Sequence, residues 1–220
     1  MLPTHILSEG DFFKRRLCVQ EYESLVGIAG VSMSSDWTLI GSGTTGKLFS
    51  HNKHDIVIKV FTGRHRFDKG LRDVIGSTLV FDMLTNSKQV RKSDRSLFNL
   101  PVAWFADVKT QDVSILMNKC SFPCLEDCAK DIQWEDHSLD IITAMSKTSD
   151  VLVRHGLRHN DMYPRNVMYD WKSTRQTVLI DYGNVEIIHK DRLGIMPEEL
   201  KSVKSPLFKC GLYGVDNIST

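Results

Sequence analysis

Two acidic residues and an asparagine in the second half of the chain constrain its fold more than any other feature. Asp161 is followed five residues later by Asn166, and Asp181 ends the apolar run of residues 178–180. An aspartate can orient a hydroxyl group and accept its proton, while an amide oxygen and a second carboxylate are hard ligands that suit Mg²⁺. The pattern therefore predicts phosphoryl transfer, in which a metal ion bridges the phosphates of ATP.

These residues lie in two motifs that resemble those of the protein kinases. Residues 159–166 read HNDMYPRN, which resembles the family's catalytic loop, H-R-D-L-x-x-x-N. Residues 181–183 read DYG, which resembles its D-F-G. The resemblance implies that Asp161 is the catalytic base and that Asn166 and Asp181 hold Mg²⁺.

The resemblance also bears on regulation. Asn160 replaces the arginine that pairs with a phosphorylated activation loop in the family. Residues 184–196 contain no Ser, Thr or Tyr, and Pro197-Glu198 resembles the end of the family's A-P-E. We therefore expect a preformed site that is active without phosphorylation of this segment.

A glycine-rich turn lies in the first half of the chain. Residues 37–40, 47–50 and 55–61 read as strands, and the turn between the first two reads GSGTTG. Glycines let a backbone approach phosphates closely. Lys59 follows the last glycine by 13 residues and is flanked by Ile58 and Val60, which resembles the family's V-A-I-K strand. The resemblance implies that Lys59 anchors the ATP phosphates and that the turn covers them through Gly41, Ser42, Gly43, Thr44 and Gly46.

A Walker A loop, G-x-x-x-x-G-K, is the rival interpretation of residues 41–47. That loop needs Ser or Thr next and then a helix, but Leu48 follows and residues 48–61 read as strands. A dinucleotide-binding fold fails for the same lack of a helix.

Residues 66–84 have helical spacing of apolar side chains, and in the protein kinases this helix carries a glutamate that pairs with the strand lysine. No Glu occurs between Ser24 and Leu125. The acids on the predicted helix are Asp68, Asp73 and Asp82, of which Asp73 lies at the most suitable position.

Other segments complete the predicted fold. Helices are expected at 8–26, capped by Asp11, and at 125–132 and 136–155, where Leu139, Ile142, Met145, Val151 and Leu152 would share one side. Residues 87–96 read as a solvated loop, 101–108 and 112–118 as strands, and 167–169 with 177–180 as a hairpin. By resemblance, Met117 is the gatekeeper, and a hinge near 118–120 offers backbone groups to adenine.

The expected fold class is α+β, with the two lobes of a protein kinase: an antiparallel sheet lobe at 37–118 and a mainly helical, truncated lobe at 119–205. Residues 1–36 would be a helical extension and 206–220 a tail. The resemblance covers about 37–198, and few residues follow. The chain is thus similar to short kinase-like proteins of some pathogens, viruses and fungi.

Composition excludes several partners. The formal net charge is +1, so no bulk field favours nucleic acid or a membrane surface, and no apolar run is long enough to span a bilayer. The N-terminus lacks a signal-peptide pattern. Cys120, Cys124 and Cys128 lack the usual zinc spacing, so we expect reduced thiols and a cytoplasmic-type environment, with delivery into a host cell if the source is a pathogen.

Three functions fit these observations. The first is an ATP- and Mg²⁺-dependent kinase acting on a protein hydroxyl, with Ser/Thr or Tyr preference and oligomeric state left open. The second is a small-molecule kinase of the choline or aminoglycoside type, because the residues around Asp161 and Asp181 resemble the motifs of those enzymes. The third is a pseudokinase that binds nucleotide and a partner, which the missing glutamate favours.

Overall fold

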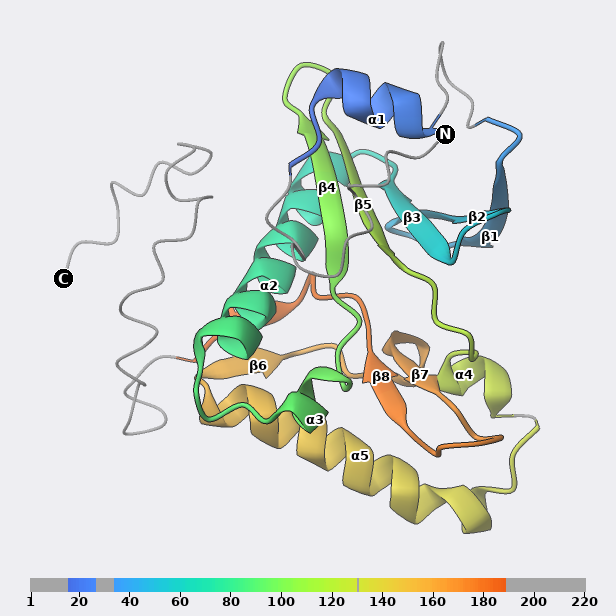
Figure 1. The fold of residues 1–220 in the computed structure, drawn as a ribbon, viewed down its shortest axis with the longest axis vertical. Helices are drawn as coiled ribbons and strands as arrows, with labels where there is room; N and C mark the ends of the chain where they lie inside the picture. The colour runs from blue at the N-terminus through green and yellow to red at the C-terminus, as the bar shows by residue number, and fades with distance from the viewer. Residues whose placement is uncertain (1–15, 27–33, 130, 189–220) are drawn as a thin grey trace, which may run out of the picture.

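A computed structural model describes residues 16–26, 34–129 and 131–188 of the chain. Figure 1 shows two parts, with a sheet and α1 above, α4, α5 and the short strands β6, β7 and β8 below, and α2 running along one side of both. This is the bilobal α+β arrangement that the sequence predicts. No helix in these ranges is both long and apolar enough to cross a membrane.

The upper lobe is a five-stranded antiparallel sheet of order β1-β2-β3-β5-β4. Its strands are β1 Trp37–Ser42, β2 Gly46–His51, β3 Ile56–Phe61, β4 Pro101–Asp107 and β5 Asp112–Asn118. These bounds agree with the predicted strands to within two residues. The β2 strand directly follows the glycine-rich turn, so the Walker A interpretation is wrong.

The two faces of this sheet pack against different helices, because successive side chains of a strand point to opposite sides. Ile56 and Ile58 of β3 pack with α1 (Val19–Val26), while Phe61 packs with Leu71 and Val74 of α2 (Arg66–Asn86). Lys59 shares the face of Phe61, so it points toward α2.

The N-terminal helix is shorter than predicted. Leu17 donates its backbone N–H to the Trp104 carbonyl at 2.8 Å, so the chain first runs beside β4. The helix begins at Val19, and the Glu21 carboxylate accepts the Cys18 N–H at 3.0 Å just before it. The rest of the predicted helix, including the proposed cap Asp11, lies outside the described residues.

The lower lobe is built on the long helix α5 (Trp134–Arg154). Two short two-stranded antiparallel sheets pack near it, and their strands are β6 Leu157–His159 with β9 Val185–Ile187 and β7 Val167–Tyr169 with β8 Thr177–Leu179. The short helices are α3 Lys92–Arg95, α4 Leu125–Cys128 and the 3₁₀ turn Pro164–Asn166. Gly156 has φ +74° just after α5, as expected for a glycine that ends a helix.

The buried face of α5 differs from the predicted one. Leu139 and Ile142 are 76% and 62% exposed, whereas Ile141, Val151 and Leu152 are buried. Polar residues occupy the rest of the buried face: His137 hydrogen-bonds the Tyr169 hydroxyl at 2.8 Å, and Thr148 donates to the Ala144 carbonyl at 2.9 Å. The predicted side is therefore confirmed for Val151 and Leu152, with Met145 packed against the same core, and is wrong for Leu139 and Ile142.

The basic segment after α2 contains a short helix that was not predicted, although its four basic side chains are exposed as expected. Residues 92–95 form α3, and Asp94 is buried and pairs with Lys147 of α5 at 3.0 Å. The predicted helix at 125–132 also ends earlier, at Cys128. Cys18, Cys120, Cys124 and Cys128 are free thiols, and the described residues contain no group of three or more Cys, His, Asp or Glu that could hold a metal.

Candidate active site

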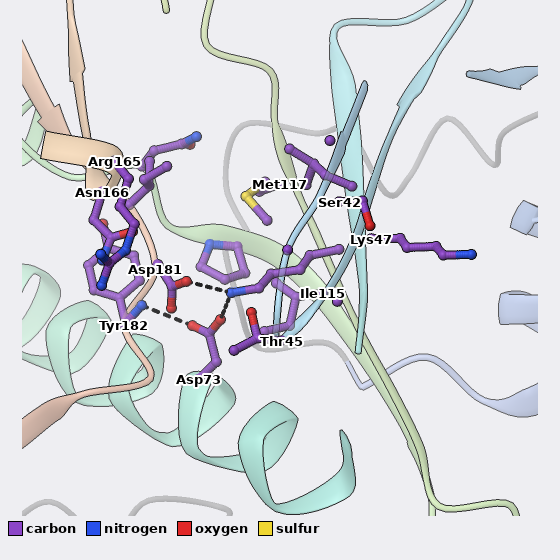
Figure 2. A pocket seen from close by; sticks show the side chains of 18 residues that line it. Ser42, Thr45, Lys47, Asp73, Ile115, Met117, Arg165, Asn166, Asp181 and Tyr182 are labelled. Carbon is purple, nitrogen blue, oxygen red and sulfur yellow. Dashed lines mark hydrogen bonds and ion pairs between the residues drawn. The ribbon is translucent and has the colours of Figure 1, made fainter. Parts of the chain in front are cut away.

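Lys59 lies between two carboxylates at the junction of the lobes. Its Nζ is 2.7 Å from Asp73 Oδ2 and 2.8 Å from Asp181 Oδ2, and its side chain is 13% exposed. Lys59 lies on β3, Asp73 on α2 and Asp181 in the segment after β8, and Figure 2 shows the Asp73 and Asp181 carboxylates close to each other. Of the three acids on α2, Asp73 is thus the partner of Lys59, the position that a glutamate fills in the protein kinases.

The short aspartate reaches Lys59 because α2 lies very close to residues 181–183. Asp73 Oδ1 accepts the Tyr182 backbone N–H at 3.0 Å. One turn later on α2, a Cβ on Gly76 would lie 1.9 Å from the Tyr182 carbonyl oxygen, a distance that no side chain tolerates. Glycine at 76 therefore permits the approach that offsets the missing methylene.

The charges of this group are strongly linked. Burial disfavours the Lys59 ammonium, but the carboxylates of Asp73 and Asp181 outweigh it and raise the pKa of Lys59 above its ordinary value. Burial raises the pKa of Asp73, and Lys59 only partly offsets this. For Asp181, burial is outweighed by Lys59, which lowers the pKa of the carboxyl. Asp181 therefore stays ionised and available to a cation.

The backbone at Asp181 has the left-handed conformation, with φ +62°. A histidine holds it there: His159 Nε2 lies 2.7 Å from the Asp181 carbonyl, and His159 Nδ1 accepts the Asp161 N–H at 3.2 Å. A carbonyl can only accept, so Nε2 carries the proton and the ring is neutral. Burial agrees with this, because it lowers the pKa of His159.

The loop of residues 159–166 places Asp161 beside Asn166. The Asn166 side-chain amide donates to the Asp161 carbonyl at 2.9 Å, and the Asn166 carbonyl accepts the Ile180 N–H at 2.9 Å. Two further residues hold the Asp161 carboxylate: Arg165 at 2.8 Å and Asn184 at 3.3 Å. Arg165 is recognisable by its i,i+4 spacing from Asp161, whereas no sequence signal indicates Asn184.

A cavity of about 300 Å³ opens between the lobes (Figure 2). Of the turn residues predicted to cover phosphates, Gly41, Ser42, Gly43 and Gly46 line it; Thr44 does not, and Thr45 does instead. Gly46 is required by the sheet itself, since a Cβ there would lie 2.4 Å from the Val60 carbonyl oxygen. Lys59, Asn166 and Asp181 line the same cavity.

The inner wall of the cavity is apolar and includes Met117, the predicted gatekeeper, and Ile115. Ile115 pairs with Lys59 across the sheet, and Met117 lies further along β5 opposite Val57. At the predicted hinge, the Asn118 carbonyl accepts from the Asn99 side-chain amide at 2.9 Å, and the Lys119 N–H donates to Asp55 at 2.9 Å. The Asn118 carbonyl and the Lys119 N–H, two backbone groups expected to contact adenine, are thus already hydrogen-bonded within the chain. Asn99 also lines the cavity, and the sequence did not predict it.

A second, smaller cavity of about 200 Å³ adjoins the first. The two share Thr45, Lys59, Asp73 and Asp181. Asp161 lines the second cavity and is not part of the first, where the glycine-rich turn and the apolar wall lie. Lys59 and Asp181 therefore line both cavities, with the predicted base Asp161 in the smaller one and the glycine-rich turn in the larger one.

The donor atoms here suit Mg²⁺. Because the Asn166 amide nitrogen bonds to Asp161, its oxygen is the free acceptor. Asp181 Oδ1 has only a long contact of 3.4 Å to the Gly183 N–H. Magnesium in phosphoryl-transfer sites takes one or two such protein ligands together with water and substrate phosphates, so Asn166 and Asp181 fit this ion.

Comparison with known proteins supports the fold. No family model and no curated protein sequence matches the chain. Among solved structures, it resembles WbdD in a crystal structure at 2.2 Å and in a co-crystal structure with the kinase inhibitor LY294002. The TM-scores are 0.51 and 0.52, each at 16% identity, over 72% and 71% of this chain.

These matches cover 34% and 36% of the WbdD chains, so this chain spans about a third of their length. At such identity the likeness concerns the fold alone. Together with the two lobes in Figure 1, it identifies a kinase-like fold.

Proposed function

We propose that this chain transfers the γ-phosphoryl group of ATP to a hydroxyl group of a protein, with Mg²⁺ as cofactor. The observation that carries the proposal is the convergence of Lys59, Asp73 and Asp181 at the boundary of two cavities. One of these is lined by the glycine-rich turn, and the other is lined by Asp161. The glutamate whose absence favoured a pseudokinase is replaced by Asp73.

The residues divide the work of the reaction between them. Lys59 would hold the α- and β-phosphates, and the backbone of residues 41–46 would cover them. Asn166 and Asp181 would hold Mg²⁺, which when bound offsets the charge of the phosphates. The Asp161 carboxylate would orient the acceptor hydroxyl, with Arg165 and Asn184 fixing its direction.

The proposed reaction is a direct displacement at the γ-phosphorus. The acceptor oxygen forms a bond to the γ-phosphorus while the bond from that phosphorus to the β–γ bridging oxygen breaks. The acceptor proton passes to Asp161, and ADP leaves. Little covalent chemistry is asked of the protein, so positioning and charge supply the rate.

The test uses the unphosphorylated recombinant chain, radiolabelled ATP, Mg²⁺ and a generic protein substrate, with identification of the phosphorylated residue. We expect Asp161→Ala and Lys59→Ala each to lower transfer by about 10²-fold or more. ATP affinity should fall for Lys59→Ala and change little for Asp161→Ala. Circular dichroism checks that both variants fold.

Three results would count against the proposal. Near wild-type turnover in both variants would remove the assignment of the site. ATP binding without transfer to any acceptor would favour a pseudokinase. Transfer to free alcohols or amines such as choline or an aminoglycoside, in preference to protein, would favour the small-molecule kinase.

A further inference from the structure

Two cations line the smaller cavity without a partner. Lys69 and Arg72 lie on α2 shortly before Asp73, and both side chains are exposed at the cavity that Asp161 also lines. Neither forms an ion pair within the ranges that the structure describes. They are therefore free to bind an anion there.

The acids of the cavity do not neutralise these cations because each is engaged elsewhere. Asp73 and Asp181 bind Lys59, at 2.7 and 2.8 Å. Asp161 binds Arg165 at 2.8 Å on its other side. Among the described residues, Lys69 and Arg72 are thus the two cations of this cavity that contact no carboxylate.

Helix stability does not explain the two cations either. Both lie in the N-terminal half of α2, and cations near a helix N-terminus oppose the helix dipole. They are also three residues apart, where like charges repel. Arg66, at the start of the same helix, contrasts with them: it binds the Asp112 carboxylate at 3.1 Å and the carbonyls of Thr110 and Gln111.

The position of the cations points to the acceptor rather than to the nucleotide. The larger cavity, with the glycine-rich turn, Ile115 and Met117, contains neither Lys69 nor Arg72. The smaller cavity contains both of them together with Asp161, the residue that would orient the accepting hydroxyl. An anion bound by these cations would therefore belong to the molecule that carries this hydroxyl.

We propose that Lys69 and Arg72 select polypeptide acceptors with acidic residues next to the accepting hydroxyl. This inference rests on the proposed function and names the substrate class of the same site. Carboxylates flanking the hydroxyl would enter the smaller cavity and pair with the two cations, which would place the hydroxyl at Asp161.

The test compares three matched peptide pools, each with Ser, Thr and Tyr at the centre and with Glu, Gln or Lys at the flanking positions. For the wild-type chain we expect kcat/KM on the Glu pool to be at least about tenfold above that on the Gln pool, with a preference that weakens as salt is added. Lys69→Ala/Arg72→Ala should remove most of this preference, and Lys69→Glu/Arg72→Glu should shift it to the Lys pool. The matched control is Lys88→Ala/Arg95→Ala, which removes two exposed cations beyond α2 and should keep the preference.

The outcomes separate this inference from the proposed function. An unchanged preference in the alanine double variant would overturn it, as would an equal loss on all three pools, since the cations would then act on the transferred phosphoryl group. If no pool is phosphorylated, binding of the Glu pool to chain loaded with Mg²⁺ and a non-hydrolysable ATP analogue replaces turnover. Equal binding by wild type and the double variant then overturns the inference. ATP binding alone, measured in parallel, reports on the proposed function.

Discussion

Asp73 is the residue at which this chain departs most clearly from the protein kinase pattern. The space around it is already filled: the side chain is 5% exposed, one oxygen binds Lys59, and the other accepts the Tyr182 N–H. Gly76 shows that the neighbouring backbone lies as close as it can. The short aspartate at position 73 therefore matches the short distance between α2 and residues 181–183, and a change in one would require a change in the other.

Restoring the family's glutamate should consequently harm the protein. We expect Asp73→Glu to lower the free energy of unfolding by about 1–3 kcal/mol, because the extra methylene overpacks a buried position. Asp73→Asn, which keeps the size, should lower phosphoryl transfer by about 10²-fold by removing one of the two charges that orient Lys59. Urea unfolding and the transfer assay measure these effects.

Asp68→Glu is the control, since Asp68 is exposed on the same helix and the same chemical change there should alter stability by less than about 0.5 kcal/mol. Wild-type stability and turnover in Asp73→Glu would show that α2 adapts freely, contrary to the fixed distance inferred from Gly76.

The element that links the two lobes is α2. Its first half packs on the sheet through Leu71 and Val74, and its second half packs in the lower core through Val80, Met83 and Leu84. Asp73 and Gly76 lie where it passes the segment after β8. Any shift of the helix there moves Asp73 relative to Lys59, so the position of α2 controls the site.

Gly76→Ala tests this link by the sign of its effect. In an exposed helix the substitution would stabilise by about 1 kcal/mol, because alanine is the better helix former. Here the new Cβ meets the Tyr182 carbonyl, so α2 must move away. We expect the free energy of unfolding to fall by about 1–3 kcal/mol and transfer to fall with it. A stabilised, fully active variant would show that the contact is not tight.

The elements could be predicted from sequence where a local signal carries them. The strands around Lys59, the helix of α2 and the hairpin at Val167–Tyr169 follow from residue periodicity and turn residues. The buried face of α5 could not be predicted in this way, because His137 and Thr148 are buried through specific hydrogen bonds. The contacts of Asn99 and Asn184 could not be predicted either, because each residue binds a partner that is distant in sequence and that only the fold brings near.

The site residues come from both lobes, so their protonation affects the stability of the whole molecule. His159 is neutral and buried between the Asp161 N–H and the Asp181 carbonyl. Its lowered pKa means that the unfolded chain binds a proton at a higher pH than the folded chain does. His51 has a lowered pKa as well, from partial burial and the nearby His54.

We therefore expect stability to fall as the pH is lowered below about 6.5, the ordinary histidine pKa. The histidine contribution is fully present above this pH and is lost as the pH approaches the lower value of the folded state. Urea unfolding at pH 7.5, 6.5 and 5.5 measures the slope. His159→Gln, which cannot titrate, should be less stable at pH 7.5 but should show a shallower loss toward pH 5.5. An equal slope in both proteins would mean that the pKa of His159 is the same in the folded and the unfolded chain, which would contradict its burial as a neutral ring.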